Sequence, residues 1–353
     1  MKKLILHLGL QKTGSTSIQE TFQWNPEPLA RAGFVYGHVD WPNGEINSNH
    51  SFPMIAAFGE GWESHEEVLR RGWSPEGLKA HFLGQVMQML DTDRNLILSG
   101  EDITDLQGPG LAAFSDLARE KGFALCPVMF IRSPLEYITS MSQTRIRHGY
   151  AFHLFDAARS RRIEPCLKLW PEMACIPFAL ALQHPDGPLG MLLERYGLPP
   201  ASAFEVIRQN ESLSDHATRI IGHVNGQVPL YLDGAVNPQR SYLDTEPLVG
   251  IVGPRFRLTR SEFLKVRELV QRENEAFARL LGPEFCDPSF RFTDRPEPWS
   301  APALAELARA MAALAPGLQE AIRGYFHDGS LVTAEEAALA ARILGQGEGP
   351  APA

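Results

Sequence analysis

The sequence predicts an α/β fold in three layers, in which helices cover both faces of a central parallel sheet. Three observations support this prediction: short apolar segments alternate with amphipathic segments through the first half of the chain, the turns between them are tight, and the sequence contains no internal repeat. A strand–helix–strand succession of this kind gives parallel strands that are buried on both faces. Ligands of such sheets bind at the carboxyl ends of the strands.

The first predicted elements are a strand, a turn and a helix. Residues 3–9 form a short apolar segment, and Ile18 and Phe22 lie four residues apart, on one face of the helix that follows. The next helix begins at Ser74 and Pro75, because serine is a favoured N-cap and proline is tolerated in the first turn. We therefore expect a buried strand flanked by amphipathic helices.

Two further strands are predicted at 95–99 and 123–131, both of them short and apolar. Between them, apolar residues at helical spacing over 111–118 predict a helix, and Pro134 opens another helix after the third strand. Prolines interrupt the pattern in residues 151–185. We expect that segment to be irregular and to act as a lid that faces the substrate.

The second half of the chain is predicted to be mainly helical. Thr259 and Glu262 form a capping box at the start of a long helix, and three short amphipathic helices follow a proline-rich link at 296–302. We therefore divide the chain into a domain of residues 1–295 and a C-terminal helical extension of residues 296–353 that ends in a flexible tail. The extension is either a helical cap or a dimerisation element, so a homodimer is one expected form. The remaining predicted elements are helices at 188–196 and 214–224 and a short strand at 204–208.

Composition and charge exclude several classes of protein. With 44% hydrophobic and 21% charged residues, the 353-residue chain is typical of an ordered globular protein. Its formal net charge of −9 disfavours a nucleic-acid polymer as a partner, because such partners select basic surfaces. The four cysteines form no Cys-x-x-Cys pair, so we expect neither a disulfide framework nor a metal centre.

The N-terminal apolar segment is short. It is broken by a histidine, so it is typical of a strand and not of a signal peptide. No segment approaches the ~20 consecutive apolar residues of a membrane-spanning helix. We expect a cytoplasmic protein without integral membrane association.

The turn after the first strand has the spacing of a nucleotide phosphate loop. Gly9 and Gly14 are five residues apart and Ser15 and Thr16 follow, as in Gly-x-x-x-x-Gly-Lys-[Ser/Thr], except that serine replaces the lysine. The lysine stands earlier, as Lys12. Backbone N–H groups at a helix N-terminus bind phosphate, and a lysine within the loop can neutralise charge on a leaving group. The alternative is a plain glycine turn with a solvated lysine.

The segment from Gln11 to Thr16 resembles the 5′-phosphosulfate loop of sulfotransferases that use 3′-phosphoadenosine 5′-phosphosulfate (PAPS). The family pattern is Pro-Lys-x-Gly-[Ser/Thr]-[Ser/Thr], so Gln11 takes the place of proline. The resemblance is closer to the bacterial and Golgi-type branches, because Ser17 stands where cytosolic members carry tryptophan. It implies a P-loop-type fold, PAPS as the donor and adenosine 3′,5′-bisphosphate as the product. The residues it assigns to donor binding are Lys12, Thr13, Gly14, Ser15 and Thr16, with Ser17 beside them.

A second anion site is predicted where the third strand ends. Arg132 lies at that end and Ser140 lies one to two turns into the next helix, so both can reach the same edge of the sheet. Arginine matches phosphate with its planar fork, and a serine hydroxyl adds a donor. The same spacing marks the 3′-phosphate site of the resembled family, and Arg255 and Arg257 lie where other members place a third donor-binding loop. The alternative for Arg132 is an ordinary surface charge at a strand end.

Sulfuryl transfer to an alcohol requires a base that removes the proton of the acceptor. Glu101 follows the second strand and is the first candidate, since several Golgi-type relatives use glutamate as the base; the alternative is a carboxylate that caps a strand end. His50 is the second candidate, because a neutral imidazole can act as a base near pH 7; the alternative is a polar loop histidine. Three cations on the helix after the arginine site are either a site for an anionic acceptor or a solvated helix face: Arg145, Arg147 and His148.

The sequence therefore predicts a PAPS-dependent sulfotransferase that needs no metal and acts on a hydroxyl of a small molecule, sugar or glycan. Two alternatives stay open. One is an ATP-dependent kinase or phosphotransferase, for which Glu101 and Asp102 after an apolar strand resemble a magnesium-binding acid; Ser15 cannot supply the missing lysine charge in that chemistry. The other is a non-catalytic nucleotide-binding protein.

Overall fold

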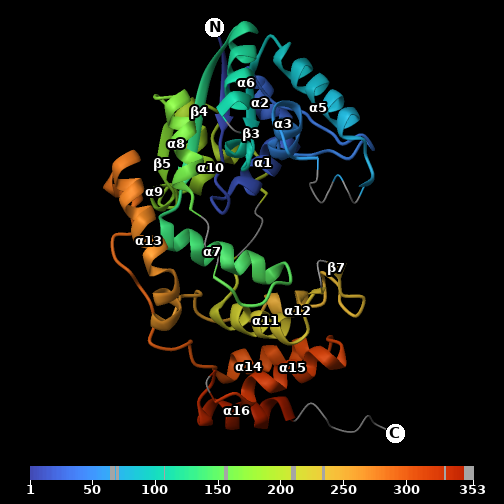
Figure 1. Cartoon of the computed structure of the whole chain (residues 1–353), viewed down its shortest axis with the longest axis vertical. Helices are drawn as coiled ribbons and strands as arrows, with labels where there is room; N and C mark the ends of the chain where they lie inside the picture. The colour runs from blue at the N-terminus through green and yellow to red at the C-terminus, as the bar shows by residue number, and fades with distance from the viewer. Residues whose placement is uncertain are drawn as a thin grey trace. The chain divides into compact units, whose positions relative to one another are not determined.

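The computed structural model describes residues 1–63, 68, 71–106, 108–154, 158–207, 212–232, 235–329 and 331–345 (Figure 1). The chain divides into two compact units. The first consists of Met1–Ser133, Ala158–Gln209 and Glu273–Cys286, and the second of Pro134–Ala157, Asn210–Arg272 and Asp287–Ala353. The predicted α/β architecture is confirmed in the first unit.

A five-stranded parallel sheet forms the centre of the first unit. Its strands, in the spatial order β2-β3-β1-β4-β5, are β1 (Lys2–His7), β2 (Phe34–Tyr36), β3 (Asn95–Ser99), β4 (Phe123–Ile131) and β5 (Ala174–Pro177). β1 is the middle strand, and its last residue, His7, lies opposite Ser99 of β3 and Val128 of β4. The segments that follow β1, β3 and β4 therefore leave the sheet at one edge. The strand order reverses at β1, which is where α/β sheets bind ligands.

Alternating side chains of β1 enter two separate hydrophobic cores. Leu4 and Leu6 pack on one face with residues of α3, α5, α6 and α8, whereas Ile5 packs on the other face with residues of α1, α2, α9 and α10. Full burial of each such side chain stabilises the fold by about 1.5–3 kcal/mol. The helices are α1 (Ser15–Trp24), α2 (Pro26–Arg31), α3 (Ser51–Phe58), α5 (Pro75–Leu90), α6 (Gly108–Glu120), α8 (Ser160–Leu169), α9 (Phe178–Ala181) and α10 (Gly187–Tyr196). Sheet and helices make the three predicted layers.

The second unit is mainly helical. Its elements are α7 (Pro134–Arg147), α11 (Asp215–Gln227), the hairpin of β6 (Tyr231–Leu232) and β7 (Ala235–Val236), α12 (Glu246–Val249), the first part of α13 (Arg260–Leu280), α14 (Ala301–Met311), α15 (Pro316–His327) and α16 (Ala334–Leu344). The capping box that opens α13 is present, since the Thr259 N–H donates to Glu262 Oε2 at 2.7 Å and the Glu262 N–H donates to Thr259 Oγ1 at 3.3 Å.

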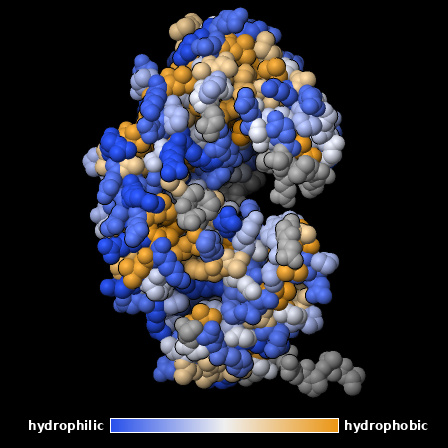
Figure 2. Space-filling view, in the orientation of Figure 1, coloured by the Kyte–Doolittle hydropathy of each residue, from blue (hydrophilic) through white to orange (hydrophobic). Residues whose placement is uncertain are grey.

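The C-terminal helices share a core with earlier parts of the chain. Leu304 of α14 and Ile322 of α15 pack in one cluster with Ile146 of α7 and Ile220 of α11. The described residues of the expected C-terminal extension therefore share their core with α7 and α11, because the apolar faces of α14 and α15 pack against these helices. Figure 2 shows hydrophilic and hydrophobic residues interspersed over the visible face, as expected where helices turn an apolar stripe inward.

Two local expectations differ from the structure. The segment 151–185, expected to be irregular, contains α8 and β5. β5 is an edge strand, where a proline such as Pro177 is tolerated. The expected strand at 204–208 is absent over Phe204–Ile207, and residue 208 lies outside the described residues. Side chains satisfy the backbone there instead: Asn25 bonds both the N–H and the carbonyl of Glu205.

Among the described residues, no helix combines the length and the apolarity that a membrane crossing requires.

Candidate functional site

The predicted phosphate loop connects the central strand β1 to α1. Gly14 is the N-cap of α1, is exposed, and has the left-handed backbone conformation with φ 79°. No side chain caps this helix end and its first turn contains no acidic residue. By contrast, serine hydroxyls cap α5, α11 and α14. No carboxylate in the first turn therefore opposes an anion at this helix end, and the helix dipole attracts one.

Lys12 is in a strained conformation. It has φ 70°, and no other non-glycine residue in the described part of the chain has a positive φ. A residue held in this region costs about 1–3 kcal/mol, and such strain concentrates at functional sites. The loop therefore holds Lys12 in a position that it does not adopt freely.

The hydroxyl groups of the loop serve its internal structure. Thr13 is fully buried and its Oγ1 donates to the Leu10 carbonyl at 2.6 Å, while the Thr13 and Ser15 hydroxyl oxygens are 3.3 Å apart. A Cβ on Gly9 would overlap the Ser15 hydroxyl, which explains the need for glycine at that position. Thr13 and Ser15 can therefore offer an anion their backbone N–H groups, whereas the side chains of Thr16 and Ser17 are half-buried.

Glu101 lies next to this loop. It follows β3, the neighbour of β1, and is half-buried. The pKa of Glu101 is raised from 4.5 to about 7. Burial is the largest cause and the adjacent Asp102 adds to it, whereas Lys12, a hydrogen bond with Ser15, and Arg162 act in the opposite direction. A carboxylate with a pKa near 7 is suited to proton transfer at neutral pH.

His50, the second candidate base, is a core residue. It is fully buried; its Nδ1 accepts from the Ser99 N–H at 3.0 Å and its Nε2 lies 2.8 Å from the Gly37 carbonyl, to which it donates. Burial lowers the pKa of His50 to about 4. With both nitrogens bonded to backbone, the ring ties β3 to the chain after β2, and we do not include His50 in the proposed site.

Arg132 follows β4, the other neighbour of β1, and is half-buried. Its guanidinium carbon lies 4.4 Å from the centre of the Phe178 ring, and its carbonyl accepts a hydrogen bond from Arg159 Nη2 at 2.7 Å. These contacts fix both ends of the residue. Lys12, Glu101 and Arg132 thus follow three adjacent strands at their carboxyl ends.

The remaining predicted site residues belong to the second unit, so their pairing with the loop stays a prediction. Ser140 is 9% exposed on α7. Arg255 and Arg257 are both exposed, and Arg255 Nη2 lies 3.9 Å from Glu136 Oε1. Two of the three predicted cations lie on α7 and have partners of their own: Arg145 lies over the Tyr150 ring, 4.3 Å from its centre, and Arg147 Nη2 lies 3.3 Å from Glu246 Oε1. His148, which follows α7, is exposed.

Sequence reasoning missed an ionic network beside the loop. Gln11 Nε2 donates to Asp102 Oδ1 at 3.0 Å, and Arg162 Nη2 of α8 lies 3.3 Å from the same oxygen. Arg162 also bonds both carboxylate oxygens of Asp105. In the sequence, this network was indicated only by Gln11, which stands where the resembled loop carries proline. Arg162 lies in the segment that was expected to be irregular, so nothing local connected it to the loop.

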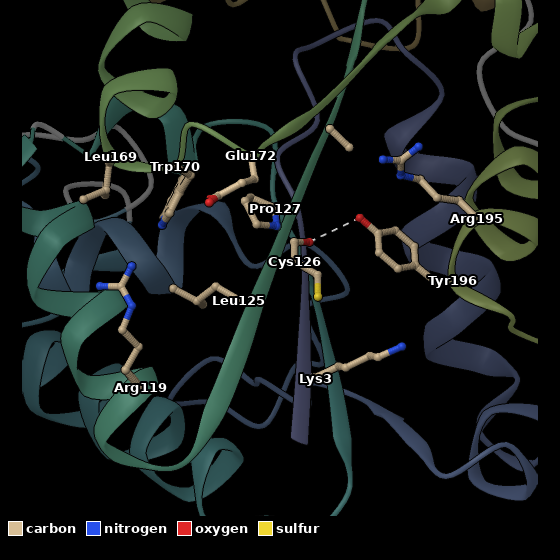
Figure 3. Close-up of a pocket in the computed structure, with 11 residues that line it drawn as sticks. Lys3, Arg119, Leu125, Cys126, Pro127, Leu169, Trp170, Glu172, Arg195 and Tyr196 are labelled. Carbon is tan, nitrogen blue, oxygen red and sulfur yellow. Dashed lines mark hydrogen bonds between the residues drawn. The ribbon is translucent and has the colours of Figure 1, made fainter. Parts of the chain in front are cut away.

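A separate pocket of about 680 Å³ lies at the opposite, amino end of the strands. It opens along β4 because β5 begins only at Ala174, opposite Val128, so that Leu125 and Cys126 have a neighbouring strand on one side only. Figure 3 shows the Tyr196 hydroxyl pointing at the Cys126 carbonyl, to which it donates at 3.4 Å. No residue predicted for donor binding lines this pocket, so it is distinct from the phosphate loop.

Comparison of the chain with protein-family models, with curated proteins and with solved structures finds no match.

Proposed function

We propose that this chain is a sulfotransferase that moves a sulfuryl group from PAPS to a hydroxyl group of an acceptor. The observation that carries the proposal is the placement of Glu101, with its pKa near 7, beside a strained lysine and a helix N-terminus that no side chain caps. Together these supply a base, a cation and a set of N–H donors at one edge of the sheet. They are the groups that transfer to an alcohol requires.

Bound PAPS would supply an activated sulfuryl group on a good leaving group. The N–H groups at the start of α1 would bind its 5′-phosphosulfate. Arg132 would bind its 3′-phosphate, because a guanidinium presents a planar fork to phosphate oxygens. Ser140, Arg255 and Arg257 are further proposed donor contacts. The fit is chemical: the loop offers N–H donors and one cation, and its first turn contains no carboxylate that would repel an anion.

Each residue of the first unit then has one task in the reaction. Glu101 accepts the proton of the acceptor hydroxyl as the bond from that oxygen to sulfur forms. Lys12 stabilises the negative charge on the bridging oxygen as its bond to sulfur breaks, which leaves adenosine 3′,5′-bisphosphate. The balance requires no oxidant and no further reactant. The acceptor is therefore an alcohol, such as a sugar, a glycan or a small molecule with a hydroxyl group.

The alternative of ATP-dependent phosphoryl transfer places a magnesium ion on the acids after β3. Here Asp102 Oδ1 already accepts from Gln11 and pairs with Arg162, so its charge is engaged by the protein. Glu101 has a raised pKa, and the protonated form that this favours is a poor ligand for magnesium. Both observations favour the sulfuryl donor over ATP.

Calorimetry tests the proposal directly. We expect adenosine 3′,5′-bisphosphate to bind without magnesium and more tightly than ATP with magnesium. Magnesium-dependent binding of ATP, with no affinity for the bisphosphate, would contradict the proposal and favour a kinase.

Turnover separates an enzyme from a nucleotide-binding protein. With labelled PAPS and a panel of alcohols and glycans, we expect sulfate incorporation that falls at least ~10²-fold in Lys12→Ala, the scale for removal of one charge-stabilising donor. The matched control is Lys79→Ala, on the exposed face of α5. Equal rates in the two variants would remove Lys12 from the mechanism.

A further inference from the structure

The phosphate loop of this chain lacks the proline that the resembled loop carries before its lysine. A proline restricts its own φ and the conformation of the residue before it, and therefore makes a loop more rigid without any side-chain contact. Gln11 provides no such restriction, and the next residue, Lys12, has a left-handed conformation that residues other than glycine rarely adopt. A side-chain contact of Gln11 can restrict the loop in place of a proline ring.

Gln11 has such a contact with Asp102. Gln11 Nε2 donates to Asp102 Oδ1 at 3.0 Å, across 91 positions of the chain. The Asp102 backbone is itself fixed, because its N–H donates to Ser51 Oγ at 2.9 Å. The loop after β1 is therefore joined to the segment after β3 by a side chain whose backbone is anchored.

Arg162 completes the tie from α8. Its Nη2 lies 3.3 Å from the oxygen that Gln11 contacts, and its guanidinium also bonds the Asp105 carboxylate. Arg162 is 25% exposed and Asp102 is 33% exposed, so water only partly screens the pair. Three segments from separate parts of the chain meet at one carboxylate.

The same groups surround Glu101. Its charged and titratable neighbours are Asp102, Lys12 and Arg162, and Ser15 forms a hydrogen bond with it. Asp102 opposes ionisation of Glu101, whereas Lys12 and Arg162 favour it. Any change in the Asp102–Arg162 pair therefore acts on the loop through Gln11 and on the Glu101 carboxyl through its charge.

We infer that Asp102 and Arg162 are positioning residues that hold Gln11, and through it Lys12, in the conformation needed for donor binding, and that they balance the charge around Glu101. This inference rests on the proposed function for its meaning in catalysis. The contacts of Asp102 with Gln11 and Arg162 do not depend on that function. Neither residue is assigned a contact with the reacting atoms, so both act through Gln11 and Glu101.

The experiment compares four variants with the parent protein, without ligand. Asp102→Asn keeps an oxygen that can accept from Gln11 but removes the charge, whereas Asp102→Ala removes both. Arg162→Gln removes the cation. Arg161→Gln is the matched control, because this neighbouring arginine is exposed and appears in no contact of the network.

Hydrogen exchange of the amides of residues 12–14 reports on the loop. We expect exchange at least tenfold faster in Asp102→Ala, little change in Asp102→Asn, and none in Arg161→Gln. Carboxyl NMR titration reports on Glu101: its pKa should fall in Asp102→Asn and rise in Arg162→Gln, each on the order of half a pH unit. A pair that does not hold the loop would leave the exchange of these amides unchanged in Asp102→Ala.

Opposite shifts in the two charge variants, with loop amides loosened in Asp102→Ala, support the inference. Unchanged loop exchange in Asp102→Ala, or shifts of the Glu101 titration in the same direction, would overturn it. Both readouts are independent of nucleotide binding and of turnover. Failure of the sulfotransferase proposal is recognised separately, by the bisphosphate calorimetry.

Discussion

Glu101→Gln tests the electrostatic description of the site through folding stability alone. Burial of the Glu101 carboxyl raises its pKa from 4.5 to about 7. Because the folded state binds this proton more tightly than the unfolded state, the contribution to stability is fully present below pH 4.5 and is lost as the pH rises through 7. Glutamine resembles the protonated acid in shape and hydrogen bonding, and it does not titrate. The variant should therefore escape this loss.

The magnitude follows from the two pKa values. Each pH unit between them corresponds to about 1.4 kcal/mol, so the full difference is about 3.5 kcal/mol at most. Partial exposure of Glu101 reduces the value actually reached. Relative to the parent protein, the free energy of unfolding of Glu101→Gln should thus increase by up to that amount between pH 4 and pH 8. Most of the change should occur between pH 4.5 and 7.

Urea unfolding of both proteins at half-unit steps from pH 4 to pH 8 measures this difference. Other groups with shifted pKa values also contribute to each curve. Burial lowers the pKa values of His7 and His50 to about 4, so both histidines destabilise the fold as the pH falls from 6.5 towards 4. These contributions are common to the two proteins and cancel in the difference. A difference that is constant across the whole range would refute the raised pKa of Glu101.

The same substitution should lower turnover by about 10²–10⁴-fold if Glu101 is the base. On the proposed function, the rate of the parent protein should rise with pH through about 7, because the base acts when it is ionised. A variant that is more stable than the parent at pH 8 and nearly inactive would show that Glu101 lowers the free energy of unfolding while it is needed for activity. A variant with the parental rate would leave Glu101 outside the mechanism.

Three further predictions concern single side chains. Lys12→Gly should be more stable than Lys12→Ala by about 1 kcal/mol in urea unfolding, because glycine adopts a φ of 70° without strain. Both variants should be inactive. Equal stability would argue against strain at this position. Gly9→Ala should lower the free energy of unfolding by about 1–3 kcal/mol, because its Cβ would overlap a side chain of the loop. Gly84→Ala, in open space on α5, should raise it by up to about 1 kcal/mol. The same effect from both substitutions would exclude the overlap. Arg219→Met should cost about 3–5 kcal/mol, because it removes the cation that pairs with the buried Asp215 carboxylate and the half-buried Glu262 carboxylate. Arg260→Met, at a side chain that is 66% exposed, is the control, with an expected change within about 0.5 kcal/mol.

Much of the fold could be read from local sequence because its signals are local. The apolar segments at 95–99 and 123–131 coincide with β3 and β4, and Ser74 caps α5 by accepting from the Gly77 N–H at 3.2 Å. The loop from Gly9 to Gly14 has its left-handed glycine at the start of α1, as the motif requires. Each of these features depends on residues within one or two turns of one another.

The sequence could not decide what depends on distant partners. A histidine in a polar loop is a plausible base until β3 and the chain after β2 enclose His50 and bond both of its nitrogens. The prolines of 151–185 indicated irregular structure, but an edge position at the sheet accommodates β5.

By itself, the sequence determined the strand–loop–helix unit around Lys12 and the candidate acid Glu101, because periodicity, glycine and capping act over short distances. Only the tertiary structure decided that Glu101 is half-buried beside Lys12, and that Asp102 joins Gln11 to Arg162. The physical reason is that burial and charge pairing depend on which segments the sheet brings to one edge. In this chain the Gln11–Asp102 contact spans 91 residues and the Asp102–Arg162 contact spans 60.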